Sequence, residues 1–268
     1  MTCATSAALL DSSSANAISL PVTPTAVVIG AATLYLGDSY QILPRLGRID
    51  VIVTDPPYQF RAEGGGHYRA DRKGMDQILA EELSDGFDHS VINPLMVGSV
   101  VVFCHNDQLP KLLTYLDGSF ERQALCIWRK KNPQPVANKH YRPVFEFYIH
   151  AWNRGAHPRG TLLDLDREIV AMAPRGDAKF GHPTVKPDAV MDKIITNVAP
   201  GLICDPFMGT GSTGVAAVKA GRQFIGIEKN PKHFATACAR LAAAQGIAPA
   251  EQQGRPEPTL TLPQGATQ

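Results

Sequence analysis

Short apolar runs, separated by polar and glycine- or proline-rich stretches, recur along the middle of the chain. Runs of about four to eight such residues between turn residues are typical of buried strands. Strands are expected at residues 33–36, 51–54, 100–104, 125–128, 144–149, 202–204 and 224–227. Helical spacing of apolar positions predicts helices at 76–83, 90–96, 109–116 and 215–220, a helix or turn at 40–46, one helix opening at Pro187 and a last one from Asn230 to about Ala244. We interpret the chain as an α/β protein.

Composition adds limits to this picture. The chain has 268 residues, 44% of them hydrophobic, with a formal net charge of +1, which is ample for one core. We expect a flexible arm at 1–30, one domain at 31–246 and a flexible tail at 247–268. The five cysteines are scattered without metal-type spacing, so reduced thiols and no metal are expected. No apolar stretch reaches membrane-spanning length and no signal peptide is recognisable, which predicts a cytoplasmic protein.

The stretch Asp55-Pro56-Pro57-Tyr58 carries the most specific chemistry. The two prolines stop the strand before it and form a rigid turn. In open α/β sheets, ligands bind at the carboxyl edge, where this turn would lie. The Asp55 carboxylate and Pro56 carbonyl can accept hydrogen bonds from the exocyclic amine of a nucleobase, and Tyr58 can stack on its ring. Taken alone, the four residues fit an ordinary loop equally well.

A glycine-rich turn follows a later strand. Gly209, Gly211 and Gly214 lie between a strand and a helix, and Glu228 ends the next strand at a spacing suited to ribose hydroxyls. Asp205 precedes the glycines, where a carboxylate would repel a pyrophosphate but suits an ammonium group. The turn therefore favours S-adenosylmethionine over a dinucleotide.

In this order, the motifs resemble those of the DNA amino-methyltransferases, which methylate exocyclic amines of adenine or cytosine. The matching segments are Gly37-Asp38-Ser39, Asp55-Pro56-Pro57-Tyr58, Trp128-Arg129-Lys130-Lys131-Asn132-Pro133, His182-Pro183-Thr184-Val185-Lys186-Pro187, Asp205-Pro206-Phe207-Met208-Gly209-Thr210-Gly211-Ser212-Thr213 and Gly226-Ile227-Glu228. The catalytic motif precedes the cofactor motif, as in the β arrangement of that family. The resemblance implies a Rossmann-like S-adenosylmethionine-dependent methyltransferase fold, with a circularly permuted, seven-stranded, mostly parallel sheet and helices on both faces.

The resemblance also implies roles for single residues. Asp55, Pro56, Pro57 and Tyr58 would form the catalytic motif. The residues expected to hold S-adenosylmethionine are Asp38, Asp55, His182, Lys186, Asp205, Phe207, Gly209, Thr210, Gly211, Ser212 and Glu228. Glu228 would accept from the ribose hydroxyls, Asp38 from the cofactor's adenine amine, and Lys186 would bind the methionine carboxylate. Two alternatives stay open: Asp38 as a turn residue that bonds its own backbone, and Lys186 as a surface cation.

A basic stretch with interleaved aromatic residues surrounds two of the predicted strands. Such a surface fits a nucleic-acid backbone, although an ordinary solvated surface explains it as well. The candidate DNA contacts are Arg129, Lys130, Lys131, Lys139 and Arg142. Residues 148–180 are the expected target-recognition insert. Because this insert is short, a homodimer or another partner is an open way to complete recognition.

The expected function is site-specific transfer of a methyl group from S-adenosylmethionine to N6 of a flipped-out adenine in double-stranded DNA. Asp55 at the first position of its motif resembles adenine methylases more than cytosine-N4 methylases, which are the main alternative. Methylation of RNA or of a protein amide, a nicotinamide-dependent oxidoreductase and a non-catalytic DNA-binding module are further alternatives. No nuclease motif is visible, so a restriction-modification role needs another chain.

Overall fold

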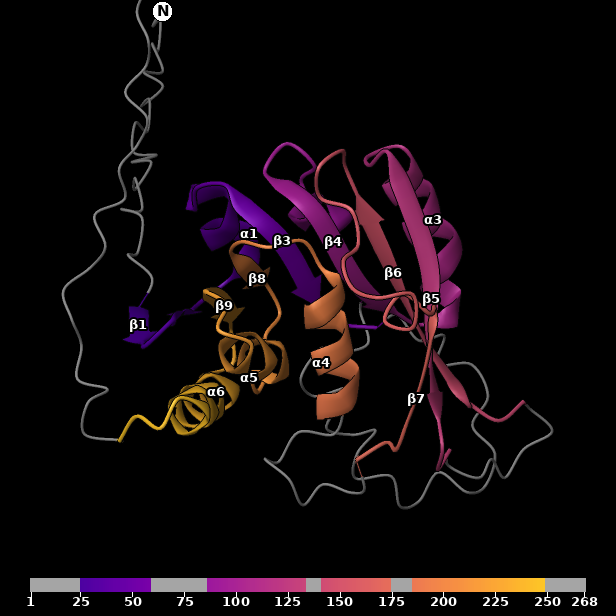
Figure 1. Ribbon diagram of the computed structural model, residues 1–268. Helices are drawn as coiled ribbons and strands as arrows, with labels where there is room; N and C mark the ends of the chain where they lie inside the picture. Colours follow the sequence, from indigo (N-terminus) through magenta and orange to yellow (C-terminus); the bar gives the residue numbers. More distant parts are fainter. Residues whose placement is uncertain (1–24, 59–85, 134–140, 175–184, 249–268) are drawn as a thin grey trace, which may run out of the picture.

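The computed structural model describes residues 25–58, 86–133, 141–174 and 185–248, which fold into a sheet with helices on both faces (Figure 1). The described strands are β1 (Thr25–Ile29), β2 (Ala32–Leu36), β3 (Ile49–Thr54), β4 (Val97–Cys104), β5 (Arg122–Lys130), β6 (Phe145–Trp152), β7 (Glu168–Ala171), β8 (Ile203–Asp205) and β9 (Phe224–Glu228). The described α-helices are α1 (Ser39–Ile42), α3 (Leu109–Asp117), α4 (Asp188–Asn197), α5 (Ser212–Lys219) and α6 (Pro231–Ala244). None of these helices is long and apolar enough to cross a membrane.

The strand order across the sheet is β1-β2-β9-β8-β3-β4-β6-β5-β7. Strands β2, β9, β8, β3 and β4 are mutually parallel, whereas β6 is antiparallel to both of its neighbours, β4 and β5. Strand β8 comes late in the chain yet lies in the middle of the sheet. The methyltransferase fold class is therefore confirmed, with the seven expected strands at the centre and one further strand at each edge.

The two edge strands correct the expected boundaries. Strand β1 lies inside the stretch expected to be a flexible arm, and it pairs antiparallel with β2 through a turn at Gly30. Strand β7 lies inside the expected insert at 148–180 and pairs in parallel with β5. Both strands are short, and pairing along a sheet edge supports them more than their own sequence pattern does.

The helix expected at 90–96 is wrong. A single 3-10 turn, His89–Val91, is followed by a turn in which Asn93 accepts a hydrogen bond from the N–H of Leu95. Pro94 disfavours the helical conformation at the residue before it, which explains why the apolar spacing here does not form an α-helix. The helix expected at 76–83 lies outside the described residues.

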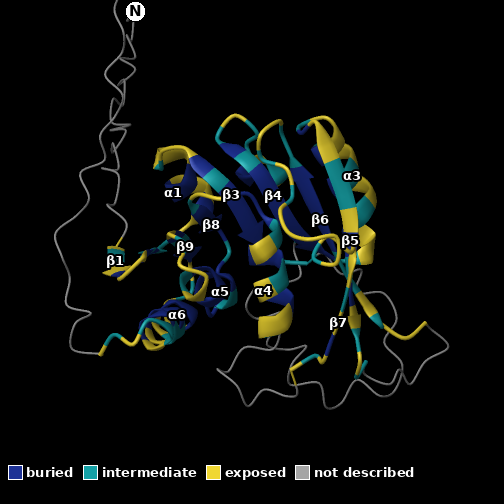
Figure 2. Cartoon of the chain, in the orientation of Figure 1, coloured by how far each residue is buried: buried dark blue, intermediate teal, exposed yellow. Residues whose placement is uncertain are grey.

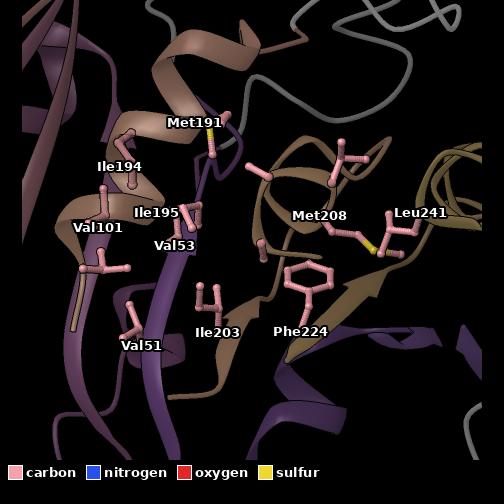
Figure 3. Close-up of a cluster of buried hydrophobic side chains, with 14 of the residues drawn as sticks. Val51, Val53, Val101, Met191, Ile194, Ile195, Ile203, Met208, Phe224 and Leu241 are labelled. Atoms are coloured by element: carbon pink, nitrogen blue, oxygen red, sulfur yellow. The ribbon is translucent and has the colours of Figure 1, made fainter. Parts of the chain in front are cut away.

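The sheet separates two apolar layers, and β3, which is largely buried (Figure 2), contributes to both. Val51 and Val53 pack on the side of α4, α5 and α6, whereas Ile52 packs with Leu112 and Leu116 of α3 on the opposite side. Figure 3 shows the first layer, in which Met191, Ile194 and Ile195 of α4 lie over β3 and β4. Helices cover β3 on both faces, so its sequence is a continuous apolar run. The polar residues after such strands are left at the carboxyl edge of the sheet.

Candidate active site

Four acidic side chains predicted as functional lie at the carboxyl ends of neighbouring strands. In the register of the sheet, Leu36 pairs with Glu228, Asp205 with Gly226, and Cys204 with Ile52. Asp38, Glu228, Asp205 and Asp55 therefore follow one another along one edge, after β2, β9, β8 and β3. Residues more than 170 positions apart in the chain are thereby brought to one site.

Asp55 has two oxygens in different surroundings. Oδ2 accepts a hydrogen bond from the ammonium group of Lys186 at 2.5 Å. Oδ1 is buried and has no hydrogen-bond partner among the described residues. Burial raises the pKa of the Asp55 carboxyl, the nearby Glu146 adds to this effect, and Lys186 opposes it. Among the described residues, Oδ1 is thus a desolvated acceptor without a hydrogen-bond partner, at the position expected for the target amine.

The rest of the Asp55 turn is held from two sides. The Tyr58 hydroxyl accepts a hydrogen bond from Lys186 at 3.2 Å, and the Tyr58 ring lies beside the His105 ring, with centroids 6.4 Å apart. The side chain of Gln108, itself buried, donates to the carbonyl of Pro57 at 3.3 Å. Burial raises the pKa of Tyr58 well above its usual value, and Asp55 and Glu146 add to this, so the phenol stays neutral.

Lys186 is not a surface cation, because it is only 6% exposed. Its ammonium also lies 3.3 Å from Oε2 of Glu146, whose Oε1 is 2.7 Å from the ammonium of Lys130. The four side chains form a cluster of alternating charge, which we call the Asp55 charge cluster. Burial alone would lower the pKa of Lys186, but Asp55 and Glu146 outweigh it and raise that pKa. Binding of a methionine carboxylate by Lys186 stays a prediction; the structure shows it against Asp55 instead.

The glycine turn between β8 and α5 is fixed by conformation and by contacts. Gly209 and Gly211 have φ angles of +52° and +83°, a region that side-chain-bearing residues rarely adopt. Arg240 of α6 donates to the carbonyl of Thr210 at 2.6 Å and lies 3.4 Å from the hydroxyl of Ser212. Arg240 was not singled out from the sequence, because nothing in its local pattern indicates that it reaches this turn.

Asp205 is a centre of hydrogen bonding beneath the turn. Its oxygens accept from the hydroxyls of Thr54 and Thr213, at 2.7 and 2.6 Å, and from the N–H of Phe207 at 3.1 Å. Burial raises its pKa to about 7, against the effect of these three donors. Asp205 thus ties β3, β8 and α5 together, and its expected contact with the cofactor ammonium stays a prediction.

Glu228 and Asp38 also have local contacts. Oε2 of Glu228 accepts from the N–H of Gly209 at 2.9 Å, and Oε1 accepts from the N–H of Asn230 at 2.7 Å. Burial raises the pKa of Glu228. Asp38 is exposed and caps α1 by accepting from the N–H of Tyr40 at 3.0 Å. Asp38 is therefore a turn residue that bonds the nearby backbone. Its expected contact with the adenine amine of the cofactor stays a prediction.

An aromatic group lies beside the turn. Phe207 has edge contacts with Tyr40 at 6.1 Å and with Phe87 at 6.0 Å between ring centroids. Phe207 was expected at the cofactor site, whereas Phe87 and Tyr40 were not singled out from the sequence. Their apolar faces would suit a planar ring next to the glycine turn.

The candidate DNA contacts separate into three groups. Lys131 and Arg142 are exposed, and Arg129 pairs with Glu168 of β7 near the surface. Lys130 belongs to the Asp55 charge cluster, in which it pairs with Glu146, and its contact with DNA stays a prediction. The indole of Trp128 is buried and donates to the carbonyl of Ala171, so it is not free for stacking. Lys139 and His182 lie outside the described residues.

A parallel sheet with this glycine turn and this row of acids is the arrangement of an α/β enzyme that handles an adenosine-containing ligand. The chain belongs to the DNA methylase family, whose sequence profile matches residues 49–239. Its relatives in that family are N6 and N4 DNA methyltransferases. The resemblance noted in the sequence is thereby confirmed.

Individual relatives agree with this assignment. The chain is 24% identical to the DNA adenine methyltransferase YhdJ of Escherichia coli (strain K12), over 80% of this chain and 84% of that protein. The crystal structure of the M1.HpyAVI–SAM complex superposes with a TM-score of 0.58 at 26% identity, covering 78% of this chain and 98% of that one. The cytosine-N4-specific PvuII DNA methyltransferase has the same fold, with a TM-score of 0.58 at 16% identity, over 80% of this chain and 87% of that one.

Proposed function

We propose that this DNA methylase transfers a methyl group from S-adenosylmethionine to the N6 amine of a flipped-out adenine in double-stranded DNA. The observation that carries the proposal is the Oδ1 atom of Asp55, a buried acceptor without a partner among the described residues. Leaving such an atom unsatisfied costs about 1–3 kcal/mol, which a donor from a substrate would recover. An exocyclic amine supplies that donor.

The residues at the sheet edge fit S-adenosylmethionine, which is the methyl donor of this class of enzyme. The left-handed Gly209 and Gly211 let a ligand approach the backbone, and the acids Asp38 and Glu228 can accept from its adenine amine and ribose hydroxyls. A sulfonium compound carries positive charge, which suits an edge lined by carboxylates better than a pyrophosphate does.

Bound S-adenosylmethionine would supply a methyl group on a positively charged sulfur. The transfer forms a nitrogen–carbon bond, breaks the carbon–sulfur bond and leaves its electron pair on sulfur. Asp55 and the Pro56 carbonyl would accept from the two amine hydrogens and turn the nitrogen lone pair toward the methyl group. The methylated nitrogen then loses one proton, and the carboxylate of Asp55 is placed to take it. Positioning in a site shielded from water supports the rate.

Adenine is proposed over cytosine for two reasons. Aspartate leads the catalytic motif, as in adenine methylases, and YhdJ of Escherichia coli is named a DNA adenine methyltransferase. Cytosine-N4 is the second candidate, because the PvuII enzyme shares the fold. The proposed DNA contacts are the exposed Lys131 and Arg142, and the proposed site of action is cytoplasmic DNA.

The test is transfer of labelled methyl from S-adenosylmethionine to unmethylated double-stranded DNA, followed by separation of the product nucleosides. Label in 6-methyladenine is expected. Label in 4-methylcytosine would keep the mechanism and reject the proposed base. Label only in RNA or protein, or no label despite cofactor binding, would reject the proposed function.

A further inference from the structure

Glu146 is a partly buried acid of the site that no sequence motif singled out. It lies near the start of β6, whose antiparallel direction brings its first residues to the carboxyl edge of the sheet. In the register, Phe147 pairs with Cys104, the last residue of β4, and Glu146 pairs with Trp128 of β5. Glu146 therefore reaches the site from strands that carry none of the expected catalytic residues.

Among the described residues, Glu146 forms ion pairs with two ammonium groups. Its Oε1 lies 2.7 Å from Lys130, and its Oε2 lies 3.3 Å from Lys186, an ion pair without a hydrogen bond. Burial alone would raise the pKa of Glu146, but Lys186 and Lys130 outweigh it and hold that pKa below its usual value. Glu146 is thus an anion in the protein, placed behind Lys186 as seen from Asp55.

Lys186 is enclosed on its remaining sides. Its ammonium lies 4.8 Å from the centroid of the Phe103 ring and 5.3 Å from that of Tyr58. An ammonium in such a place is stable only when its charge is balanced. If Asp55 were the only partner of Lys186, the charge of the ammonium would neutralise that of Asp55 fully. With Glu146 on the other side, the ammonium is shared between two carboxylates, so Asp55 keeps more of its negative charge.

We propose that Glu146 is a positioning residue for methyl transfer, which acts through Lys186 to hold the Asp55 carboxylate with Oδ2 engaged and Oδ1 directed at the target amine. This inference rests on the proposed function. Lys130 completes the arrangement from β5 by balancing the charge of Glu146. The proposed DNA-contacting face and the reacting acid would thus be connected through two neighbouring residues, Lys130 at the end of β5 and Lys131 directly after it.

The charged and titratable groups around Asp55 come from several elements. Lys186 precedes α4, Glu146 is on β6, Tyr58 is on the same turn, Cys104 ends β4 and Asp205 ends β8. Burial raises the pKa of Cys104 to about 12, so it stays a thiol, whereas Asp205 titrates near pH 7. Because Asp205 is a second acid with a raised pKa near Asp55, the test compares the pH limbs of the variants with that of the wild type and does not use the absolute position of a limb.

The test is the pH profile of kcat for methyl transfer by the wild-type protein and three variants. Glu146→Gln removes a negative charge near Asp55, so the acid limb is expected to move to lower pH by roughly half a unit or more. Its kcat on the plateau should fall at least about tenfold while KM for S-adenosylmethionine changes little. In Lys130→Gln, the negative charge of Glu146 is no longer balanced. The acid limb of this variant should therefore move to higher pH. Asp192→Asn, which removes an exposed negative charge on α4, is the control and should leave the limb in place.

Each outcome decides the proposal. An acid limb of Glu146→Gln that coincides with the wild-type limb would show that Glu146 is structural only. If circular dichroism shows that Glu146→Gln is unfolded, the direction of the Lys130→Gln limb decides alone. If the wild-type protein methylates nothing, the proposed function is rejected, and this inference with it. If the wild-type protein is active but the acid limbs of the variants do not move, only this inference is rejected.

Discussion

At the scale of single residues, the close pairing of Lys186 with Asp55 and Glu146 is the main departure from what the sequence indicated. Sequence spacing identified Asp55 and Lys186 separately, because both belong to recognisable motifs. It gave no sign that they touch, since 131 positions separate them and only the tertiary fold brings them together. No motif singled out Glu146, because its partial burial depends on packing that periodicity does not report.

The pairing predicts that Lys186 contributes strongly to stability. Lys186→Met would leave Asp55 and Glu146 as neighbouring, partly buried carboxylates without their shared cation. The expected loss in the free energy of unfolding is about 3 kcal/mol, the lower end of the range for buried pairs, because Asp55 is 23% exposed. Urea denaturation at neutral pH measures it.

Lys219→Met is the matched control for this prediction. The Lys219 ammonium faces Asp188 at 3.8 Å, and both side chains are largely exposed. Its removal should change the free energy of unfolding by less than about 1 kcal/mol. Equal losses in the two variants would contradict the balancing role of Lys186.

At the scale of elements, the sequence predicted most of the central sheet and less of its edges. Strands such as β3 and β4 are covered on both faces and therefore read as continuous apolar runs. Asn230 and Pro231 open α6 as expected, because capping chemistry is local. Strands β1 and β7 were missed because their stability comes from a neighbouring strand, and the helix at 90–96 was wrong because the effect of Pro94 was overlooked.

The glycine turn before α5 gives a prediction at this scale. A Cβ atom at Gly211 would lie 2.8 Å from Cδ1 of Leu241 and 3.1 Å from Cβ of Ala237, at a φ angle of +83°. Gly211→Ala is therefore expected to push α6 away from the turn and to weaken binding of S-adenosylmethionine at least about tenfold. A tenfold weaker affinity corresponds to a loss of about 1.4 kcal/mol in binding free energy. Isothermal titration calorimetry gives the affinity.

Gly221→Ala separates backbone strain from displacement of the turn. Gly221 has a φ angle of +69°, yet a Cβ atom there would meet nothing within 4 Å. This variant should lose about 1 kcal/mol of stability, as a left-handed alanine does, and keep its affinity for the cofactor. If both variants bind S-adenosylmethionine as the wild type does, Gly211 has no part in forming the site.

At the scale of the whole molecule, the side proposed to face DNA is the one where Lys131 and Arg142 reach solvent. The net charge of +1 gives no general attraction to DNA, so affinity depends on local groups. Lys131 and Arg142 are exposed near the ends of β5 and β6 that lie at the carboxyl edge, on the side of the sheet edge that holds Asp55.

This arrangement predicts how DNA binding depends on salt. The double substitution Lys131→Gln with Arg142→Gln should lower DNA affinity and reduce the slope of log K against log salt by about 2, one for each phosphate that is no longer neutralised. Fluorescence anisotropy over a salt series measures both quantities. An unchanged slope would place the DNA-binding surface elsewhere on the molecule, whereas affinity for S-adenosylmethionine should stay the same in either case.

The central claim is that the Asp55 carboxylate receives the target amine at the edge of this sheet. The most direct measurement is the single-turnover rate of methyl transfer to DNA by the wild type and by Asp55→Asn, with Asp192→Asn on the exposed side of α4 as control. We predict a loss of more than about 100-fold for Asp55→Asn at unchanged affinity for S-adenosylmethionine, and wild-type rates for the control. An Asp55→Asn protein that binds the cofactor and transfers methyl groups at the wild-type rate would contradict the account.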